Sequence, residues 1–457
     1  MTRLRLLAIV LLPMALVACG EDTPSSGQSD AFSSTYTPAA SEPVLIRNAT
    51  VLTGTGEQLA NTDVLLLDGR IERVGRKLAA PRDGVVIDAT DKFVTPGIID
   101  VHSHLGVYAS PGVRAHSDGN EATSPNTAEV WAEHSVWPQD PGFSAALAGG
   151  ITTLQILPGS ANLFGGRSVT LKNVFSRTVR GMKFPGAPYG LKMACGENPK
   201  RVYGSRGGAP STRMGNVAGY RAAWIAASQY RDKLKAAENG EGEAPDRDLQ
   251  LETLAGVLDG DILVHNHCYR ADEMATMMAL ADEFDYKITA FHHAVESYKI
   301  ADLLAENDVC SAMWADWWGF KMEAYDGVRE NVPMVHASNA CAIVHSDSAI
   351  GIQRLNQEAA KALAAGRRAG IDISDADAIA WITANAAKAL GIDAQTGTLE
   401  PGKMADVVVW DRSPFSVYGK AEHVFIDGVH AFDRNDRSRQ PVTDFALGTV
   451  SQPGASQ

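Results

Sequence analysis

The chain has 457 residues, of which 45% are hydrophobic, and it carries a formal net charge of -13. Its length exceeds that of one ordinary domain, and its hydrophobic content is typical of a globular protein with a sizeable buried core. The acidic balance argues against nucleic acid as a partner, because nucleic-acid-binding proteins need a basic face to displace counterions from phosphates.

The first twenty residues have the layout of an export signal. Arg3 and Arg5 precede an apolar run from Leu6 to Ala18, which is shorter than the roughly 20 apolar residues needed to span a bilayer. The run ends in Leu-Val-Ala-Cys-Gly, which resembles a bacterial lipobox and implies a lipid on Cys19. We therefore expect residues 1–18 to be a lipoprotein signal peptide. A plain signal peptide with an incidental cysteine is the alternative.

This signal predicts where the protein works. We expect an exported lipoprotein that faces the periplasm, held at the outer membrane of a Gram-negative bacterium by its N-terminal lipid alone. Residues 19–43 are rich in Ser, Thr, Pro and Ala, so they cannot bury enough apolar surface to offset the entropy lost on ordering. We interpret them as a flexible tether, and the polar, aperiodic residues 436–457 as a loose C-terminal tail.

Short alternating apolar runs mark both ends of the mature chain. Residues 44–95 contain three strand-like stretches and residues 398–435 contain two more, with Asp-Gly turns at 68–69 and 427–428. Alternation with Asp-Gly turns is typical of antiparallel β structure. The two ends are therefore predicted to form one small β-sandwich domain.

Between these ends, residues 96–397 alternate apolar strand-like runs with helical stretches. The runs lie at 97–104, 150–159, 190–196, 261–267, 286–293 and 341–347, and helical spacing is clear at 217–238, 271–284 and 358–366, where Gly366 is the expected stop. Nearly all-apolar strands between helices indicate a parallel sheet covered on both faces. Their number favours a closed (β/α)₈ TIM-like barrel over an open doubly wound sheet.

Imidazoles and one carboxylate follow the strand-like runs: His102, His104, His265, His267, His292, His293 and Asp347. The C-terminal ends of barrel strands converge on one face, and the two-residue period of a strand puts the first two histidines on the same side. Nitrogen and oxygen donors of this kind are suited to zinc or a similar divalent ion. The pattern leaves open which histidine of each later pair is a ligand.

The motifs, in their order along the chain, resemble the amidohydrolase superfamily and are most similar to its imidazolonepropionase-related branch. They are TPGIIDVHSHLG, AGGITTL, HCYRADEM, HAVESYK, HSDS, ITANAAKALGID and QTGTLEPGKMADVVVWD, and the resemblance extends from Val44 to Asp433. It implies a (β/α)₈ barrel beside a β-sandwich, with one or two divalent metal ions, expected to be zinc, at the strand C-termini.

The resemblance also assigns ligands. It makes His102 and His104 the first-strand ligands, His267 the fifth-strand ligand and His293 the sixth-strand ligand, and it makes Asp347 a ligand that transfers protons.

One ligand position stays open. Many relatives with two metals bridge them through a carboxylated lysine on the fourth strand, and others use a glutamate. Lys192 fits the lysine position, and Glu197, just past the strand end, is the alternative. We favour Lys192.

This ligand set predicts hydrolysis. A divalent ion lowers the pKa of its bound water from about 15.7 to about 7 and polarises the carbonyl under attack. Asp347 would take a proton from that water and deliver it to the leaving group. No G-x-S-x-G elbow is present, and Cys268 is interpreted as a wall residue. The spacing of Cys195, Cys268, Cys310 and Cys341 shows no paired framework, so we expect isolated buried thiols.

The substrate is expected to be a small molecule with an amide, peptide-like or cyclic amide C–N bond. Arginine binds carboxylates through paired hydrogen bonds, so candidate substrate contacts are the loop residues Lys200, Arg201, Arg270 and Tyr298. The alternatives are a deaminase or an ester or lactone hydrolase on the same fold, and a non-catalytic binding lipoprotein of the cell envelope. The sequence predicts no oligomeric state.

Overall fold

The protein is described here by a computed structural model for residues 32–440. The expected signal peptide, its lipidation site Cys19 and residues 441–457 of the expected tail lie outside the described residues. Residues 34–440 belong to one unit, which contains all the elements below. No helix within the described range is both long and apolar enough to cross a membrane.

One sheet follows the order β13-β12-β11-β10-β9-β8-β7-β6. Its strands are β6 (Ile98–Ser103), β7 (Ile151–Ile156), β8 (Phe164–Lys172), β9 (Gly190–Ala194), β10 (Leu263–Cys268), β11 (Ala290–His293), β12 (Cys310–Met313) and β13 (Ala342–Val344). Apart from Leu263, every residue in these strands is buried, which explains their nearly continuous apolar sequences.

The two ends of this sheet meet. Asp347 N–H donates to the His102 carbonyl at 3.0 Å, while Ile99 N–H and Val344 N–H donate to the carbonyls of Ile382 and Trp381. The sheet therefore curls into a nearly closed barrel, and the predicted TIM-like fold class is confirmed.

One barrel strand contradicts the predicted all-parallel sheet, because β8 runs antiparallel to both β7 and β9. The connection from residue 157 to residue 163 is too short for the crossover of about a dozen residues that a parallel neighbour needs. Two strands were not predicted from the sequence: β8, in which two glycines and several polar residues interrupt the apolar pattern, and the short strand β12.

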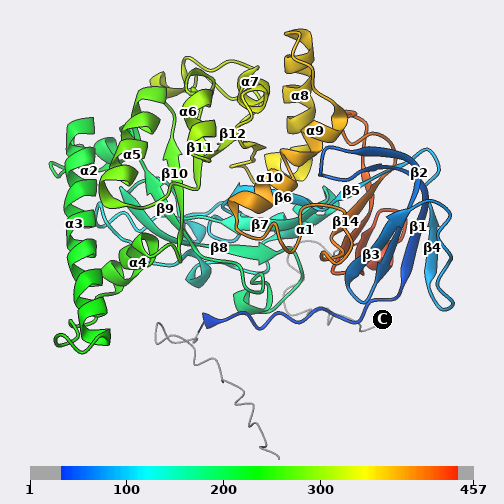
Figure 1. The fold of residues 1–457 in the computed structure, drawn as a ribbon, viewed down its shortest axis with the longest axis horizontal. Coiled ribbons are helices and arrows are strands. Elements are labelled where there is room, and N and C mark those ends of the chain that lie inside the picture. The colour runs from blue at the N-terminus through cyan, green and yellow to red at the C-terminus, as the bar shows by residue number, and fades with distance from the viewer. Residues whose placement is uncertain (1–31, 441–457) are drawn as a thin grey trace, which may run out of the picture. The chain divides into compact units, whose positions relative to one another are not determined.

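Helices cover the barrel. They are α1 (Pro141–Ala148), α2 (Glu197–Gly204), α3 (Arg213–Glu238), α4 (Leu249–Leu258), α5 (Ala271–Phe284), α6 (Ala301–Glu306), α7 (Asn331–Ala337), α8 (Leu355–Arg368), α9 (Asp375–Ala380) and α10 (Ala384–Ala389). Figure 1 shows α2 to α5 together beside β9 and β10. The helices predicted at 217–238, 271–284 and 358–366 are confirmed as α3, α5 and α8.

Gly366 does not end α8, contrary to the prediction. The helix continues to Arg368, and the left-handed turn falls at Gly370, where φ is +81°. A Cβ on Gly366 would lie 2.7 Å from the Cβ of Pro333 in α7. This glycine therefore permits close packing of the two helices.

The second sheet joins both ends of the described chain. It contains β1 (Val44–Leu52), β2 (Gln58–Leu67), β3 (Arg70–Gly75), β4 (Val85–Asp88), β5 (Phe93–Pro96), β14 (Val407–Trp410), β15 (Ala421–Ile426) and β16 (Val429–Asp433). The order is β16-β15-β14-β5-β1-β2-β3, with β4 beside β1, so antiparallel pairing of β5 with β14 unites the two segments. At the turns 68–69 and 427–428, both residues have positive φ, as two-residue hairpin turns of type I′ require.

Part of the expected tether makes defined contacts. Thr35 N–H donates to the Arg180 carbonyl at 2.9 Å, and the Tyr36 hydroxyl donates to Asp427 Oδ2 at 2.5 Å. Asp427 also lies 2.7 Å from the buried Lys172 Nζ, which is 3.2 Å from Asp406 Oδ1. Residues 34–36 are therefore tied to the barrel and to the smaller β domain.

Candidate metal centre

Three predicted ligands converge at the C-terminal end of β6. His102 is buried on the strand, His104 follows it, and their Nε2 atoms lie 3.3 Å apart. Asp347 Oδ1 is 3.6 Å from His102 Nε2 and 3.2 Å from His104 Nε2. One ligand atom from each residue lies within 4.8 Å of the others, so the three could bind a single ion.

A second group shares His102 and adds His293 and His345. His345 is a residue that the sequence analysis missed. The sequence does contain a pattern that could have identified it: His345 and Asp347 have the same two-residue spacing as His102 and His104, at the end of another strand. His293 N–H donates to His345 Nε2 at 3.1 Å, which fixes the orientation of the ring.

Two of the converging residues have unusual backbone conformations. His293 has φ of +69° and Asp347 has φ of +48°, in the left-handed region that residues other than glycine rarely adopt. Such conformations cost on the order of 1–3 kcal/mol and collect at functional sites, where surrounding contacts enforce them. The Asp347 N–H bond to His102 is one such contact.

The remaining strand-end histidines form a chain behind His102. His265 Nδ1 lies 2.9 Å from His292 Nε2, and His292 Nδ1 lies 2.8 Å from His102 Nδ1. This chain occupies Nδ1 of His102 and leaves its Nε2 for the cluster, as outer hydrogen bonds commonly orient ligand histidines. The structure thus separates His267 and His293, beside the cluster, from His265 and His292.

Aromatic rings hold His293 in place. The ring lies against Trp314, at a centroid distance of 4.4 Å, and against Tyr269, at 5.3 Å, and the centroids of these two rings are 6.0 Å apart. The Trp314 indole N–H donates to the Ser346 carbonyl at 3.2 Å. The His267 ring is 4.5 Å from His293, and its Nε2 lies 3.4 Å from Asn198 Nδ2.

Lys192 and Glu197 have different neighbours. Lys192 is fully buried on β9, with its Nζ 3.4 Å from His102 Nε2 and 3.1 Å from the Pro158 carbonyl. Glu197 begins α2, and its Oε1 lies 3.7 Å from Lys321 Nζ. The structure brings Lys192, and not Glu197, into hydrogen-bonding distance of the histidine cluster.

The electrostatic environment prepares these groups to bind a cation. Burial lowers the pKa of His102, His267 and His293 well below the usual value, so the imidazoles are neutral and offer lone pairs. Burial opposes ionisation of Asp347, but its hydrogen bond and charge interaction with His104 hold the pKa below the usual value. Burial also lowers the pKa of Lys192 to about 8.

A divalent ion fits this donor set. The Nδ1 atoms of His267, His293 and His345 are buried and accept or donate no hydrogen bond within the described residues. Buried polar atoms are rarely left without a hydrogen-bond partner, and a bound ion is one explanation for such an exception. Neutral imidazoles beside a carboxylate are the donors that zinc prefers.

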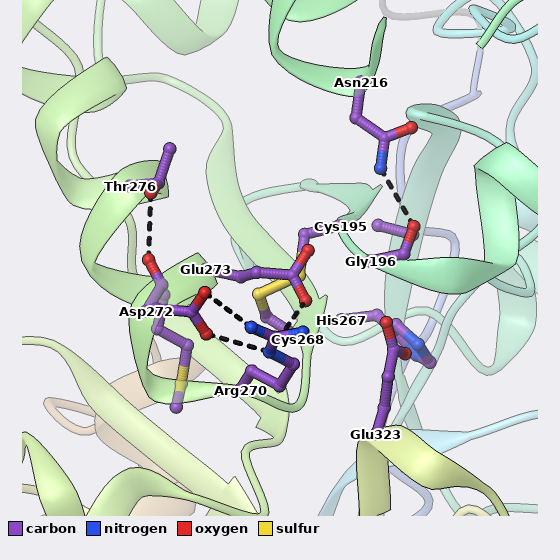
Figure 2. Close-up of a disulfide and its surroundings, with 12 residues drawn as sticks. Cys195, Gly196, Asn216, His267, Cys268, Arg270, Asp272, Glu273, Thr276 and Glu323 are labelled. Atoms are coloured by element: carbon purple, nitrogen blue, oxygen red, sulfur yellow. Dashed lines mark hydrogen bonds and ion pairs between the residues drawn. A yellow bond between two sulfur atoms is a disulfide. The ribbon is translucent and has the colours of Figure 1, made fainter. Parts of the chain in front are cut away.

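Two disulfides correct the prediction of isolated thiols. Cys195 is bonded to Cys268 and Cys310 to Cys341, across sequence separations of 73 and 31 residues. The first, drawn in Figure 2, joins the ends of β9 and β10 next to the cluster. Cys268 follows His267 directly, and Cys195 N–H donates to the His267 carbonyl at 2.9 Å. The partners meet only because neighbouring barrel strands align, so linear spacing gave no sign of them.

The predicted substrate contacts divide into two sets. A pocket of about 520 Å³ includes three of them in its lining, which consists of Glu197, Lys200, Arg201, Ser211, Arg213, Arg270, Met322 and Glu323. Figure 2 shows the Arg270 guanidinium already paired with Asp272, at 2.8 Å. Tyr298 lies apart from this lining, and its hydroxyl donates to the Asp326 carbonyl at 3.1 Å.

Lys321 is a second residue that sequence reasoning missed. It belongs to the loop after the unpredicted strand β12, and its Nζ lies 3.8 Å from the Tyr269 ring centroid and 3.4 Å from Asn198 Oδ1. No motif around it marked it as part of the site.

Comparison with known proteins agrees with this arrangement. Residues 239–431 match the amidohydrolase family. The crystal structure of an amidohydrolase from Thermotoga maritima MSB8 has 36% sequence identity and a TM-score of 0.79, and the match covers 86% of this chain and 100% of that chain. The chain belongs to the amidohydrolase family. Amidohydrolases typically bind divalent metal, in keeping with the histidine cluster.

Two curated relatives extend the comparison. Amidohydrolase tasK of Hapsidospora irregularis is 33% identical over 459 residues, a match that covers 92% of this chain and 46% of the relative. The chain therefore spans less than half the length of that protein. A 5-methylthioadenosine/S-adenosylhomocysteine deaminase of Symbiobacterium thermophilum is 26% identical over 407 residues, covering 81% of this chain and 85% of the relative.

Proposed function

We propose that this amidohydrolase uses a divalent metal, zinc in the first instance, to hydrolyse a C–N bond in a small amide, peptide-like or cyclic amide substrate. The observation that carries the proposal is the position of Asp347. Its carboxylate lies within 4 Å of His102, His104 and His293, at the mouth of a barrel whose donor set fits a cation.

The metal would be held by residues from several strand ends: His102, His104, His267, His293, His345, Asp347 and Lys192. When bound, the ion supplies a Lewis acid for the carbonyl under attack and lowers the pKa of the attacking water. His345 extends the ligand set expected from sequence.

Asp347 is proposed as the proton-transfer group. Its neighbours keep the carboxylate ionised near neutral pH, so it can accept a proton from the attacking water as the new C–O bond forms. The same proton is then delivered to the nitrogen as the C–N bond breaks. Trp314 and Tyr269 pack against the His293 ring and hold it beside the cluster.

Lys192 is the better candidate for a bridging ligand than Glu197. Burial lowers the pKa of its amine to about 8, which increases the neutral fraction that can be carboxylated. Its Nζ already lies beside His102, whereas the Glu197 carboxylate interacts with Lys321.

The substrate contacts are proposed to centre on Lys200 and Arg201. Both line the pocket, and neither makes an ion pair within residues 32–440. Arg270 has its charge balanced by Asp272, and Tyr298 lies outside the lining. Two free cations at the pocket suit a substrate with a carboxylate, such as an N-acyl amino acid or a dipeptide.

Export is proposed together with this activity. The lipobox-like sequence at Cys19 motivates it, and two disulfides between barrel strands support it, because disulfides persist in oxidising compartments and are rare in the cytosol. Lipid labelling of the full chain, compared with a Cys19→Ala variant, tests the anchor. Labelling that persists in the variant would exclude this anchor.

Deamination is the second candidate. It is favoured by the similarity to the deaminase of Symbiobacterium thermophilum, which extends over 81% of this chain. A deaminase releases ammonia, whereas amide hydrolysis releases a carboxylate and an amine, so product analysis on both substrate classes separates the two functions.

The decisive experiment combines metal analysis with turnover. We expect metal in the purified enzyme, hydrolysis of a dipeptide and N-acyl amino acid panel, and loss of turnover in Asp347→Asn but not in Asp302→Asn, an exposed control. Turnover that survives metal removal would contradict the proposal. Bound metal without turnover on amides, nucleosides or esters would instead favour a binding protein.

A further inference from the structure

A second group of metal-binding side chains lies on the smaller β domain. His423 is on β15, and His430 and Asp433 are on β16, with one potential ligand atom of each within 4.8 Å of the others. None of the three belongs to the centre at the barrel mouth, and the proposed hydrolysis does not use them.

A bulge in the hairpin brings the three residues to one side. His423 pairs directly with Asp433, but the pairing then shifts from Val424 opposite Phe432 to Phe425 opposite His430. Residues three apart in a regular strand point to opposite faces. The extra residue, Ala431, reverses this alternation, so that His430 joins Asp433 beside His423.

The spacing of the three atoms matches a tetrahedral ion. His423 Nδ1 lies 3.1 Å from His430 Nε2 and 3.4 Å from Asp433 Oδ2, and His430 Nε2 lies 3.9 Å from Asp433 Oδ2. Tetrahedral zinc with bonds of about 2.0–2.2 Å separates its ligand atoms by roughly 3.3–3.6 Å. Three corners of such a site are therefore nearly in position.

Neighbouring groups orient these ligands. Asn435 N–H donates to Asp433 Oδ1 at 2.8 Å, which leaves Oδ2 to face the histidines. The His430 ring stacks on Phe425 at a centroid distance of 4.6 Å. Outer contacts of this kind hold metal ligands in their binding orientation.

Both imidazoles are available as neutral donors. Burial, followed by the proximity of His423, lowers the pKa of His430 to about 4, and burial lowers the pKa of His423. A hydrogen bond between the rings accounts for the contact between His423 and His430 alone. A cation shared by His423 Nδ1, His430 Nε2 and Asp433 Oδ2 accounts for the convergence of all three atoms.

We propose that His423, His430 and Asp433 bind a divalent cation of the zinc type at a site separate from the catalytic centre. Their side chains are 13%, 19% and 15% exposed, so water can reach the fourth coordination position. The ion would link β15 to β16, the edge strand of the sheet, and stabilise the last hairpin of the domain.

The test uses the metal-loaded full chain and the variants His430→Gln and Asp433→Asn, with His134→Gln as a control at an exposed histidine. After dialysis against micromolar Zn²⁺, we expect both site variants to hold one equivalent less zinc than the wild type and the control, with unchanged turnover. With free Zn²⁺ at a hundredfold excess over the Kd of this site, its occupancy should raise Tm by about 3 °C in the wild type and in His134→Gln, and this rise should be absent from both site variants.

Two results would overturn the proposal. One is equal zinc content and an equal Tm response in the wild type and both site variants. The other is zinc loss accompanied by loss of turnover, which would assign the missing ion to the catalytic centre. Each substitution removes one ligand of the proposed site. The test therefore remains decisive if only one of the two variants folds.

Discussion

Replacing Cys195 and Cys268 together with alanine removes the cross-link beside the metal centre. Replacing Cys310 and Cys341 provides a matched control, because that disulfide also joins neighbouring barrel strands. Its cysteines lie at the start of β12 and just before β13, however, at the opposite ends of the strands from the cluster. The two double variants therefore separate stability from function.

The expected loss of stability follows from the two loop lengths. In the chain-entropy treatment, separations of 73 and 31 residues correspond to about 4.4 and 3.7 kcal/mol of stabilisation. With an entropy of unfolding of about 2.1 cal/mol/K per residue over roughly 400 residues, these values lower Tm by about 5 and 4 °C.

The two variants should differ in activity. Cys195 N–H donates to the His267 carbonyl, and Cys268 follows His267, so loss of the first disulfide frees the strand ends that position this ring. Loss of an outer support typically costs ten- to a hundredfold in metal affinity or activity. The control pair should change kcat/KM by less than about twofold.

Scanning calorimetry and steady-state kinetics on the two variants check this reasoning. If both lose activity equally, proximity to His267 is not the cause. If Tm is unchanged in both, the cross-links do not restrict the unfolded chain as argued. The expected result is a lower Tm in both double variants and a lower activity only in the variant that lacks Cys195 and Cys268.

Three further predictions concern single positions. Lys172→Met should lower the free energy of unfolding by about 3–5 kcal/mol, because it leaves Asp406 and Asp427 buried without their cation. A Tm within about 1 °C of the wild-type value would contradict this. His345→Ala should reduce bound metal and turnover together, measured by mass spectrometry and kinetics, and full metal content would remove His345 from the ligand set. Lys192→Gln should lower metal content more than Glu197→Gln does, and the reverse order would make Glu197 the bridging ligand.

Local sequence patterns predicted much of the fold. Alternating residues and the Asp-Gly turns at 68–69 and 427–428 fixed the hairpins, because positive φ at both turn positions is a property of those residues. The helical spacing at 217–238 predicted most of α3. β8 was not predicted because its two glycines and polar side chains are buried by neighbouring strands, so its sequence shows neither an apolar run nor an alternating pattern.

The candidate site was predicted where a motif was local and missed where partners are distant. His102, His104 and Asp347 follow apolar runs and were predicted from that position. His345 stood in the same motif as Asp347 and could have been found by its two-residue spacing. The stacking of Trp314 on His293 could not, because it joins separate loops.

The sequence by itself determined the strand and helix periods, the turn chemistry and the residue types that gather at strand ends. These depend on interactions within a few residues of one another. Only the tertiary structure decided that Cys195 meets Cys268, that His265 and His292 stand behind His102, and that a bulge brings His430 to His423. Each of these contacts depends on the register between strands, which is set by the packing of the whole sheet.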